Sequence, residues 1–247
     1  MTALKVSLLL LASAALHGPA AAADPFTGAP LEFSVEVPAV PLEGSARIYY
    51  IAPWEVETSA VPSPPPAGSA GDLGDLAELR RWQAERTEAQ CAAARLQEDA
   101  GFKAFYGAVS PFPVPVPKEV EKVFWKVKLD TASVVWLLKR KYERPRPYLR
   151  FPGLEPCVER EDSDAYPSGH SAVAWVFAHI LSDLVPASSP EFRAYAGRAA
   201  LNRVLGGVHH PTDTEAGRLL GGAVYAALKK DRDFRADLEL LRRSLRP

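Results

Sequence analysis

The chain has 247 residues, of which 47% are hydrophobic, and its formal net charge at pH 7 is −1. This length suits one domain with a hydrophobic core, or at most two small domains. A chain without an excess of basic residues has no general means of neutralising a phosphate backbone, so nucleic acid is not an expected partner, although a local cationic pocket remains compatible with this balance.

Residues 1–23 have the pattern of a cleavable signal peptide. Lys5 supplies the positive start, Val6–Leu16 form the apolar stretch, and Ala20–Ala23 offer small residues for cleavage before Asp24. An uncleaved membrane anchor is the alternative, but the apolar stretch is shorter than the hydrocarbon core of a bilayer requires. We therefore expect a periplasmic or secreted protein without stable membrane insertion.

Residues 24–71 are rich in proline and are expected to form an extended N-terminal arm. Short β-prone pieces such as Arg47–Ile51 alternate with prolines, and Pro62–Gly68 is typical of a polyproline linker or surface wrap.

Residues 72–247 show helical periodicity and are expected to form the main domain. A charged helix opens at Leu73 and runs through Leu96, and prolines at 145 and 147 end the second helix. Ser189 is the expected N-cap of a later helix, with Pro190 at its first position. The expected helices span residues 72–96, 118–142, 168–184, 189–205 and 211–230, with a short one from 231. Together they predict an all-α helical bundle.

Cys91 and Cys157 are compatible with an oxidising compartment. A disulfide between them and two separate buried thiols are both open from the sequence. No histidine lies near either cysteine, so they do not form a zinc motif.

Three clusters carry the residue types that chemistry needs. In the first, Lys139 lies in the last turns of a helix and Arg146 lies just beyond its end. Two cations held there suit a tetrahedral dianion, since arginine binds in bidentate fashion and lysine acts as a point charge. The alternative is a basic helix C-terminus that complements its own dipole.

In the second cluster, Ser168, Gly169 and His170 precede an apolar run, so they lie at a helix N-terminus. Free N–H groups and the serine hydroxyl make such a terminus an anion site, and glycine permits close approach of a ligand. An ordinary turn capped by Ser168 would explain the first two residues but not the histidine.

In the third cluster, Arg203 precedes His209 and Asp213, which are four residues apart at the start of another helix. The carboxylate can accept a hydrogen bond from one ring nitrogen and leave the other as a nucleophile. A turn with two histidines is one alternative. Zinc bound by His209, His210 and Asp213 is another, but no further ligands cluster in the sequence, so we expect no metal.

Taken together, the three clusters resemble the signature of the phosphatidic acid phosphatase type 2 superfamily, which also includes vanadium haloperoxidases. The matching blocks are Lys139-x6-Arg146-Pro147, Pro167-Ser168-Gly169-His170 and Arg203-x5-His209-x3-Asp213. Within this superfamily the chain is most similar to bacterial class A nonspecific acid phosphatases, over about Pro62–Leu240. Further support comes from Tyr166–Ala172, Ala216-Gly217-Arg218 and Gln97–Ala100, the last expected in an earlier helix. One departure is Asn202, where the family usually has serine, and we expect it to alter neighbouring contacts without abolishing activity.

The resemblance implies that His209 attacks phosphorus, that Asp213 orients it, and that His170 protonates the leaving group and later activates water. The implied phosphoryl ligands are Lys139, Arg146, Ser168, Gly169 and Arg203. The implied activity is hydrolysis of small phosphomonoesters through a phosphohistidine, without metal or other cofactor, and with an optimum on the acid side of neutral.

Three other functions remain open at the level of sequence. A vanadium-dependent haloperoxidase would use the same cations to hold vanadate. A phosphatase specialised for lipid or prenyl (pyro)phosphates would act at a membrane surface. A phosphate-binding protein without turnover is the third, but it needs neither a nucleophile nor an acid. The sequence leaves the physiological substrate open, and it is compatible with a homo-oligomer.

Overall fold

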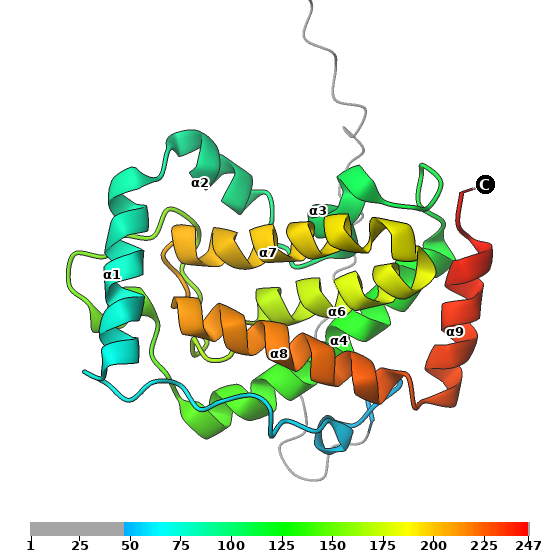
Figure 1. The fold of residues 1–247 in the computed structure, drawn as a ribbon, viewed down its shortest axis with the longest axis horizontal. Coiled ribbons are helices and arrows are strands. Elements are labelled where there is room, and N and C mark those ends of the chain that lie inside the picture. The colour runs from blue at the N-terminus through cyan, green and yellow to red at the C-terminus, as the bar shows by residue number, and fades with distance from the viewer. Residues whose placement is uncertain (1–46, 247) are drawn as a thin grey trace, which may run out of the picture. The chain divides into compact units, whose positions relative to one another are not determined.

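The computed structural model describes residues 47–246, which form an all-α fold with no strand in that range (Figure 1). The expected signal peptide and residues 24–46 of the expected arm lie outside the described residues. The α-helices are α1 (Ala70–Glu85), α2 (Glu88–Arg95), α3 (Phe102–Tyr106), α4 (Lys118–Tyr142), α5 (Pro147–Arg150), α6 (Gly169–Leu184), α7 (Ser189–Leu205), α8 (Pro211–Leu228) and α9 (Arg232–Arg243). Short 3₁₀ turns are Pro53–Glu55, Gly107–Val109 and Pro186–Ser188. Within residues 47–246, no helix is both long enough and apolar enough to span a bilayer.

Helix α6 lies at the centre of the bundle and packs against α4, α7 and α8 (Figure 1). Its side chains are apolar almost all the way round, as expected for a helix that is covered on every side. Val173, Val176, Phe177, Ile180 and Leu181 are all buried. The site candidates at the N-terminus of α6 are therefore held on a largely buried helix.

Two glycines allow α8 to lie directly on α6. A Cβ atom on Gly217 would stand 2.5 Å from the carbonyl oxygen of Ser168, and one on Gly221 would stand 2.8 Å from that of Ala172. Such distances leave no room for a side chain. The close approach brings the two helix N-termini together, and the Ser168 amide donates to the Asp213 carbonyl at 2.9 Å.

The end of α4 is as the prolines predict. Glu143, the C-cap, has a left-handed backbone (φ 45°), and Pro145 and Pro147 follow it. The chain therefore leaves the helix in a short segment, outside any helix, that carries Arg144 and Arg146.

The prediction of one helix over residues 72–96 is wrong, because the structure has two helices there. Arg86 and Thr87 are extended, and the Thr87 hydroxyl accepts from the Gln90 amide while the Gln90 side chain accepts from the Thr87 amide. This capping box starts α2 afresh, and the Thr-x-x-Gln pattern that encodes it is visible in the sequence.

Two smaller expectations also need correction. Gln97–Ala100 follow the end of α2 instead of lying within a helix. The N-cap of α7 is Ser188, not Ser189, and it makes no side-chain capping bond, because the 3₁₀ turn before it delivers the chain in a near-helical conformation.

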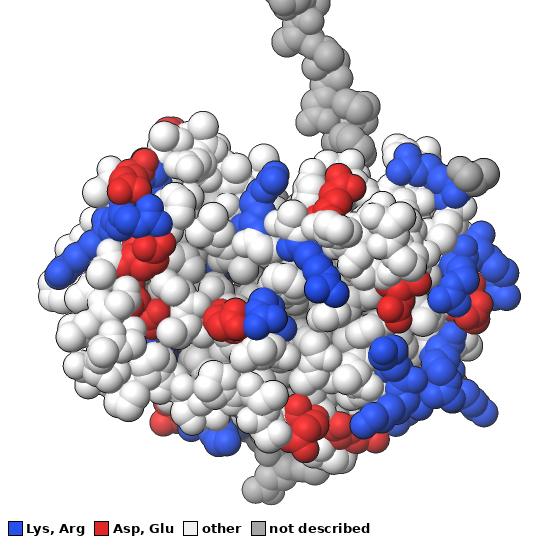
Figure 2. Space-filling view, viewed as in Figure 1, with Lys and Arg blue, Asp and Glu red and all other residues white. Residues whose placement is uncertain are grey.

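Residues 47–61, part of the expected arm, pack against the bundle. Tyr50 and Ile51 are buried in the main core, and the backbone amides of Tyr49 and Tyr50 donate to the Asp130 carboxylate on α4 at 3.0 and 2.8 Å. Surface charges of both signs are interspersed on the face drawn in Figure 2, with Lys and Arg gathered where α9 lies.

Cys91 and Cys157 form a disulfide, with their Cα atoms 5.8 Å apart. It ties α2 to the loop that follows α5, across 66 residues of sequence. This loop, residues 151–168, carries several groups that face the candidate site.

Candidate active site

The eight residues singled out in the sequence come together where the N-termini of α6 and α8 meet the segment after α4. Arg146 and Arg203 contact His209, and Ser168 contacts Asp213. Lys139 shares Ser163 with Arg146, and Gly169 and His170 follow Ser168 in the first turn of α6. The residues are Lys139, Arg146, Ser168, Gly169, His170, Arg203, His209 and Asp213.

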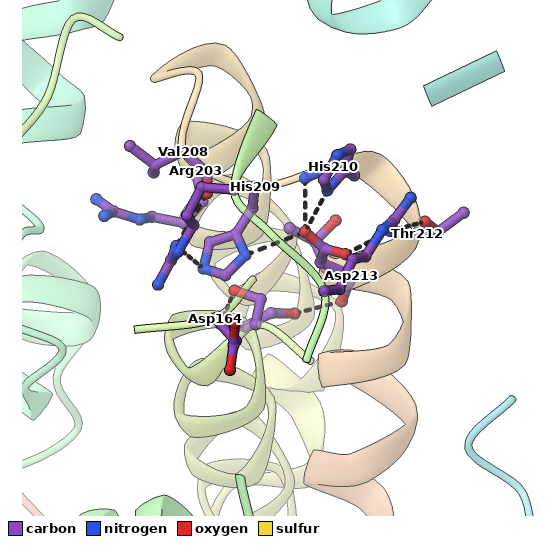
Figure 3. Close-up of polar contacts among 12 residues, drawn as sticks. Asp164, Arg203, Val208, His209, His210, Thr212 and Asp213 are labelled. Atoms are coloured by element: carbon purple, nitrogen blue, oxygen red, sulfur yellow. Dashed lines mark hydrogen bonds and ion pairs between the residues drawn. The ribbon is translucent and has the colours of Figure 1, made fainter. Parts of the chain in front are cut away.

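His209 has a defined tautomer in this structure. Nη1 of Arg146 lies 2.9 Å from Nε2 of His209. Nδ1 of His209 lies 3.3 Å from a carboxylate oxygen of Asp213 (Figure 3). A guanidinium only donates, so Nε2 is the unprotonated nitrogen and Nδ1 carries the proton. Burial, followed by the charge of Arg146, lowers the pKa of His209 to about 3. The ring is therefore neutral, with a lone pair directed at a cation.

Asp213 is fully buried and accepts from several donors. Figure 3 shows His209 and His210 on two sides of its carboxylate. One oxygen takes the His210 amide at 2.7 Å and Nδ1 of His210 at 2.9 Å, and the other takes Nη1 of Arg144 at 2.5 Å. Burial alone would raise the pKa of Asp213, but the hydrogen bonds from the two histidines hold it well below its usual range.

Two buried arginines face one carboxylate across the pocket. Glu161 receives Nη2 of Arg146 on one oxygen and Nη2 of Arg203 on the other, both at 2.7 Å. Arg203 is 1% exposed, yet its Nε and Nη1 groups have no hydrogen-bond partner. A buried N–H group without an acceptor costs free energy, so these two groups mark a position for an anion that the protein itself does not fill.

Lys139 extends from the last turn of α4 towards the loop after α5. Its ammonium group donates to the Ser163 hydroxyl at 3.0 Å and to the Asp164 carbonyl. Burial and the neighbouring Arg146 lower its pKa to about 8, so it remains a cation at neutral pH.

The N-terminus of α6 supplies the remaining candidates. The Ser168 hydroxyl accepts from the Ser171 amide and so caps the helix, which is the role given above as the alternative to anion binding. Nε2 of His170 lies 2.8 Å from the Glu98 carbonyl oxygen, which only accepts, so Nε2 carries a proton. Burial, followed by Arg203, lowers the pKa of His170 to about 4. Asn202, the departure from the family pattern, donates to the Gln97 side chain at 2.7 Å.

Sequence reasoning missed Glu161, Arg144 and the contact made by His210. Glu161 lies in a loop with no regular periodicity, so nothing in the pattern distinguishes it from its acidic neighbours. Arg144 is two residues from Arg146, and that proximity is the one signal that could have drawn attention to it.

These features define an all-α protein in which buried cations surround a histidine–aspartate pair. Residues 128–236 match the model of the PAP2 superfamily. This region contains all eight candidates.

Curated relatives are named as acid phosphatases. The chain is 31% identical to an acid phosphatase of Zymomonas mobilis over 113 residues, which cover 43% of this chain and 42% of the relative. It is 29% identical to a non-specific acid phosphatase of Providencia stuartii over 106 residues, 41% of this chain and 42% of the relative. The matches thus span less than half the length of these relatives.

A solved structure with a similar fold is a bacterial vanadium-dependent iodoperoxidase. Its TM-score is 0.53 at 18% sequence identity, over 69% of this chain and 52% of that chain. At this identity the likeness concerns the fold alone.

Proposed function

We propose that this protein is a phosphatase that hydrolyses small phosphomonoesters through a phosphohistidine on Nε2 of His209. The observation that carries the proposal is the tautomer of His209, whose lone pair faces a pocket of buried cations. Such a nitrogen is a nucleophile held ready for an electrophile that arrives as an anion. The acid phosphatases among the relatives support the same reaction class.

In the first step, Nε2 of His209 attacks phosphorus and the bond from phosphorus to the leaving oxygen breaks. The spare N–H groups of Arg203, together with Arg146 and Lys139, bind the phosphoryl oxygens and stabilise the charge of the transition state. First-turn amides of α6, including that of Gly169, add donors of the kind that helix N-termini supply. Fixed cations and helix amides thus provide the electrostatic stabilisation, and the proposal needs no metal.

His170 gives its proton to the leaving alkoxide. Its Nε2–H is already held by Glu98, so protonated His170 would donate from Nδ1. A phosphate dianion beside the ring favours that protonated form and raises its pKa above the value in the empty pocket. In the second step His170 takes a proton from water, the water oxygen attacks phosphorus, and the bond from phosphorus to His209 breaks.

The two pKa values predict an acid-side optimum. The reaction requires His209 neutral and His170 protonated, and the pKa of each is below neutral in the empty pocket, at about 3 and about 4. The productive window therefore lies on the acid side, and bound phosphate extends it upward.

Export from the cytoplasm is part of the proposal. The signal-peptide pattern of residues 1–23 supports it, and the disulfide between Cys91 and Cys157 is the kind of bond that persists in oxidising compartments.

The test is hydrolysis of p-nitrophenyl phosphate by the purified protein with a chelator present, comparing wild type with His209→Ala. His179→Gln is the matched control, because this histidine stacks on Tyr225, away from the pocket. We expect turnover in wild type and control and a loss of at least about a thousand-fold in His209→Ala. Equal turnover by wild type and His209→Ala would refute the assignment of the nucleophile. No turnover by the folded wild type would favour vanadium-dependent halide oxidation or a lipid phosphate substrate instead.

A further inference from the structure

Arg144 binds the back of the Asp213 carboxylate, on the side away from His209. Its Nη1 group donates to Asp213 at 2.5 Å and to the Thr212 hydroxyl at 2.7 Å. The side chain is 5% exposed and it is not one of the pocket cations. Because Arg144 and Arg146 are separated by one residue, the same short segment contacts Asp213 with one arginine and His209 with the other.

The second terminal nitrogen of the Arg144 guanidinium binds two carboxylates on helix α1. This nitrogen, Nη2, donates to Asp75 at 2.9 Å and to Asp72 at 3.3 Å, and both acids are buried. Asp75 also accepts from the amide of Thr212 at 3.1 Å, so it fixes the start of α8 as well as the guanidinium. These acids lie outside residues 128–236, the region matched by the family model.

We propose that Arg144 is a positioning residue for the proposed reaction: it acts through Asp213, whose carboxylate it holds in the orientation that keeps Nε2 of His209 directed at the pocket. The proposal rests on the function proposed above. Its geometric basis is that Arg144 bridges Asp213 to a rigid helix, and a planar guanidinium bound to carboxylates at both ends has little freedom to turn.

The need for Arg144 follows from the number of donors that compete for Asp213. The Asp213 oxygen that faces His209 at 3.3 Å is also bound by His210 at 2.9 Å. Without Arg144 on the other oxygen, the carboxylate can rotate towards His210, whose own ring is held by Arg150 at 3.2 Å. The bond to His209 is the longest of the set and is therefore the first to be lost.

Charge gives the arrangement a second consequence. Charged and titratable groups surround the pair His209 and Asp213 on several elements. They are Lys139 on α4, Arg144 and Arg146 after α4, Glu161 in the loop after α5, His210 before α8, and Asp72 and Asp75 on α1. Among these, Arg144 is the cation in direct contact with Asp213. Its removal leaves the aspartate charge less compensated, which favours the protonated form of His209.

The test compares Arg144→Met, Arg144→Lys and Arg140→Met in the full-length protein. Arg140→Met is the matched control, since it removes the same charge from an exposed position in the last turn of α4, four residues before Arg144. For each variant we would measure kcat and KM against pH for p-nitrophenyl phosphate, the Kd of inorganic phosphate by calorimetry, and the protonation of His209 by ¹⁵N NMR between pH 5 and 8.

Arg144→Met is expected to lower kcat by at least about ten-fold while KM and the phosphate Kd stay within about two-fold, because the groups that bind phosphate are untouched. The acid limb of kcat/KM moves up by about one pH unit, and His209 begins to protonate within the NMR range. Arg144→Lys keeps the charge but cannot bridge two helices. Its acid limb of kcat/KM should therefore lie close to that of wild type, while its kcat stays nearly as low as that of Arg144→Met. Arg140→Met leaves all of these unchanged.

An unshifted acid limb together with an unchanged kcat in Arg144→Met would overturn the proposal, as would a rise in KM with kcat intact. If Arg144→Met does not fold, Arg144→Lys decides alone through its ratio of kcat to phosphate affinity. The NMR measurement needs no turnover. A wild type without phosphatase activity would therefore refute the proposed function. The protonation of His209 in wild type and Arg144→Met would still test whether Arg144 positions Asp213.

Discussion

Glu161 occupies the space between the two arginines that would bind a phosphoryl group, so it is an internal competitor for any anion. Its two carboxylate oxygens bridge Arg146 and Arg203 at 2.7 Å each, as two oxygens of a phosphate would. Glu161→Gln removes the negative charge while nearly conserving the size of the side chain. We expect the variant to bind inorganic phosphate more tightly than wild type.

The size of the effect follows from the two ion pairs. A hydrogen bond between charged groups contributes about 1.5–3 kcal/mol net, and partial exposure reduces this. The side chain of Glu161 is 31% exposed, so we take about 2 kcal/mol for both bonds together. Displacing this carboxylate then weakens phosphate binding by about 30-fold, and the variant recovers that factor.

Calorimetric titration with inorganic phosphate measures the affinity directly, at a fixed pH and ionic strength. Glu155→Gln is the matched control, because Glu155 lies in the same loop and pairs with the exposed Arg160 at 3.2 Å. Thermal unfolding gives a second reading. Without phosphate, Glu161→Gln should have a lower melting temperature than wild type, since two buried arginines lose their partner. Added phosphate should raise the melting temperature of the variant by more than it raises that of wild type.

A phosphate Kd for Glu161→Gln equal to or weaker than that of wild type would refute this reasoning. It would mean that Glu161 organises the two arginines for the ligand and does not compete with it.

Three further predictions concern pH and packing. Burial and Arg203 lower the pKa of His170 in the folded state to about 4, from its ordinary value of 6.5. The contribution of the neutral ring to stability is therefore complete above pH 6.5 and is lost as the pH falls towards 4. His170→Asn should therefore flatten the fall in melting temperature between pH 6.5 and 4, and an unchanged slope would contradict the assignment. Replacing Cys91 and Cys157 with serine should lower the free energy of unfolding by about 4 kcal/mol in a denaturant titration, given the long loop that the disulfide closes; an unchanged midpoint would argue against the bond. Gly217→Ala should destabilise by about 1–3 kcal/mol because its Cβ meets backbone at 2.5 Å, whereas Gly197→Ala, with nothing within 4 Å, should stabilise slightly. Equal effects of the two glycine changes would contradict the close approach of α6 and α8.

The positions of most helices could be predicted because their causes are local. The prolines after α4, the serine before α6 and the apolar spacing of α6 act within one or two turns, and the structure has these elements where the pattern places them. The break between α1 and α2 also has a local cause, the capping box at Thr87, which apolar spacing does not reveal.

The motif residues of the candidate site could be predicted from the sequence, but two of their partners could not. His209, Asp213 and the pocket cations carry motif spacings that identify them one by one. Glu161 and Arg144 do not, because their importance comes from partners 42 and 69 residues away in the chain. The role of Glu161 can be recognised only in the folded protein, where α7 brings Arg203 within hydrogen-bond distance of its carboxylate.

The helical class, the ends of the principal helices and the list of candidate site residues follow from the sequence alone, since propensity, capping and motif spacing are properties of short segments. The tertiary structure is needed to see which nitrogen of His209 is unprotonated, which donors share Asp213, and that Glu161 lies between Arg146 and Arg203. Those facts depend on hydrogen bonds and charges between distant segments, and their energies exist only once burial has removed water from the groups involved.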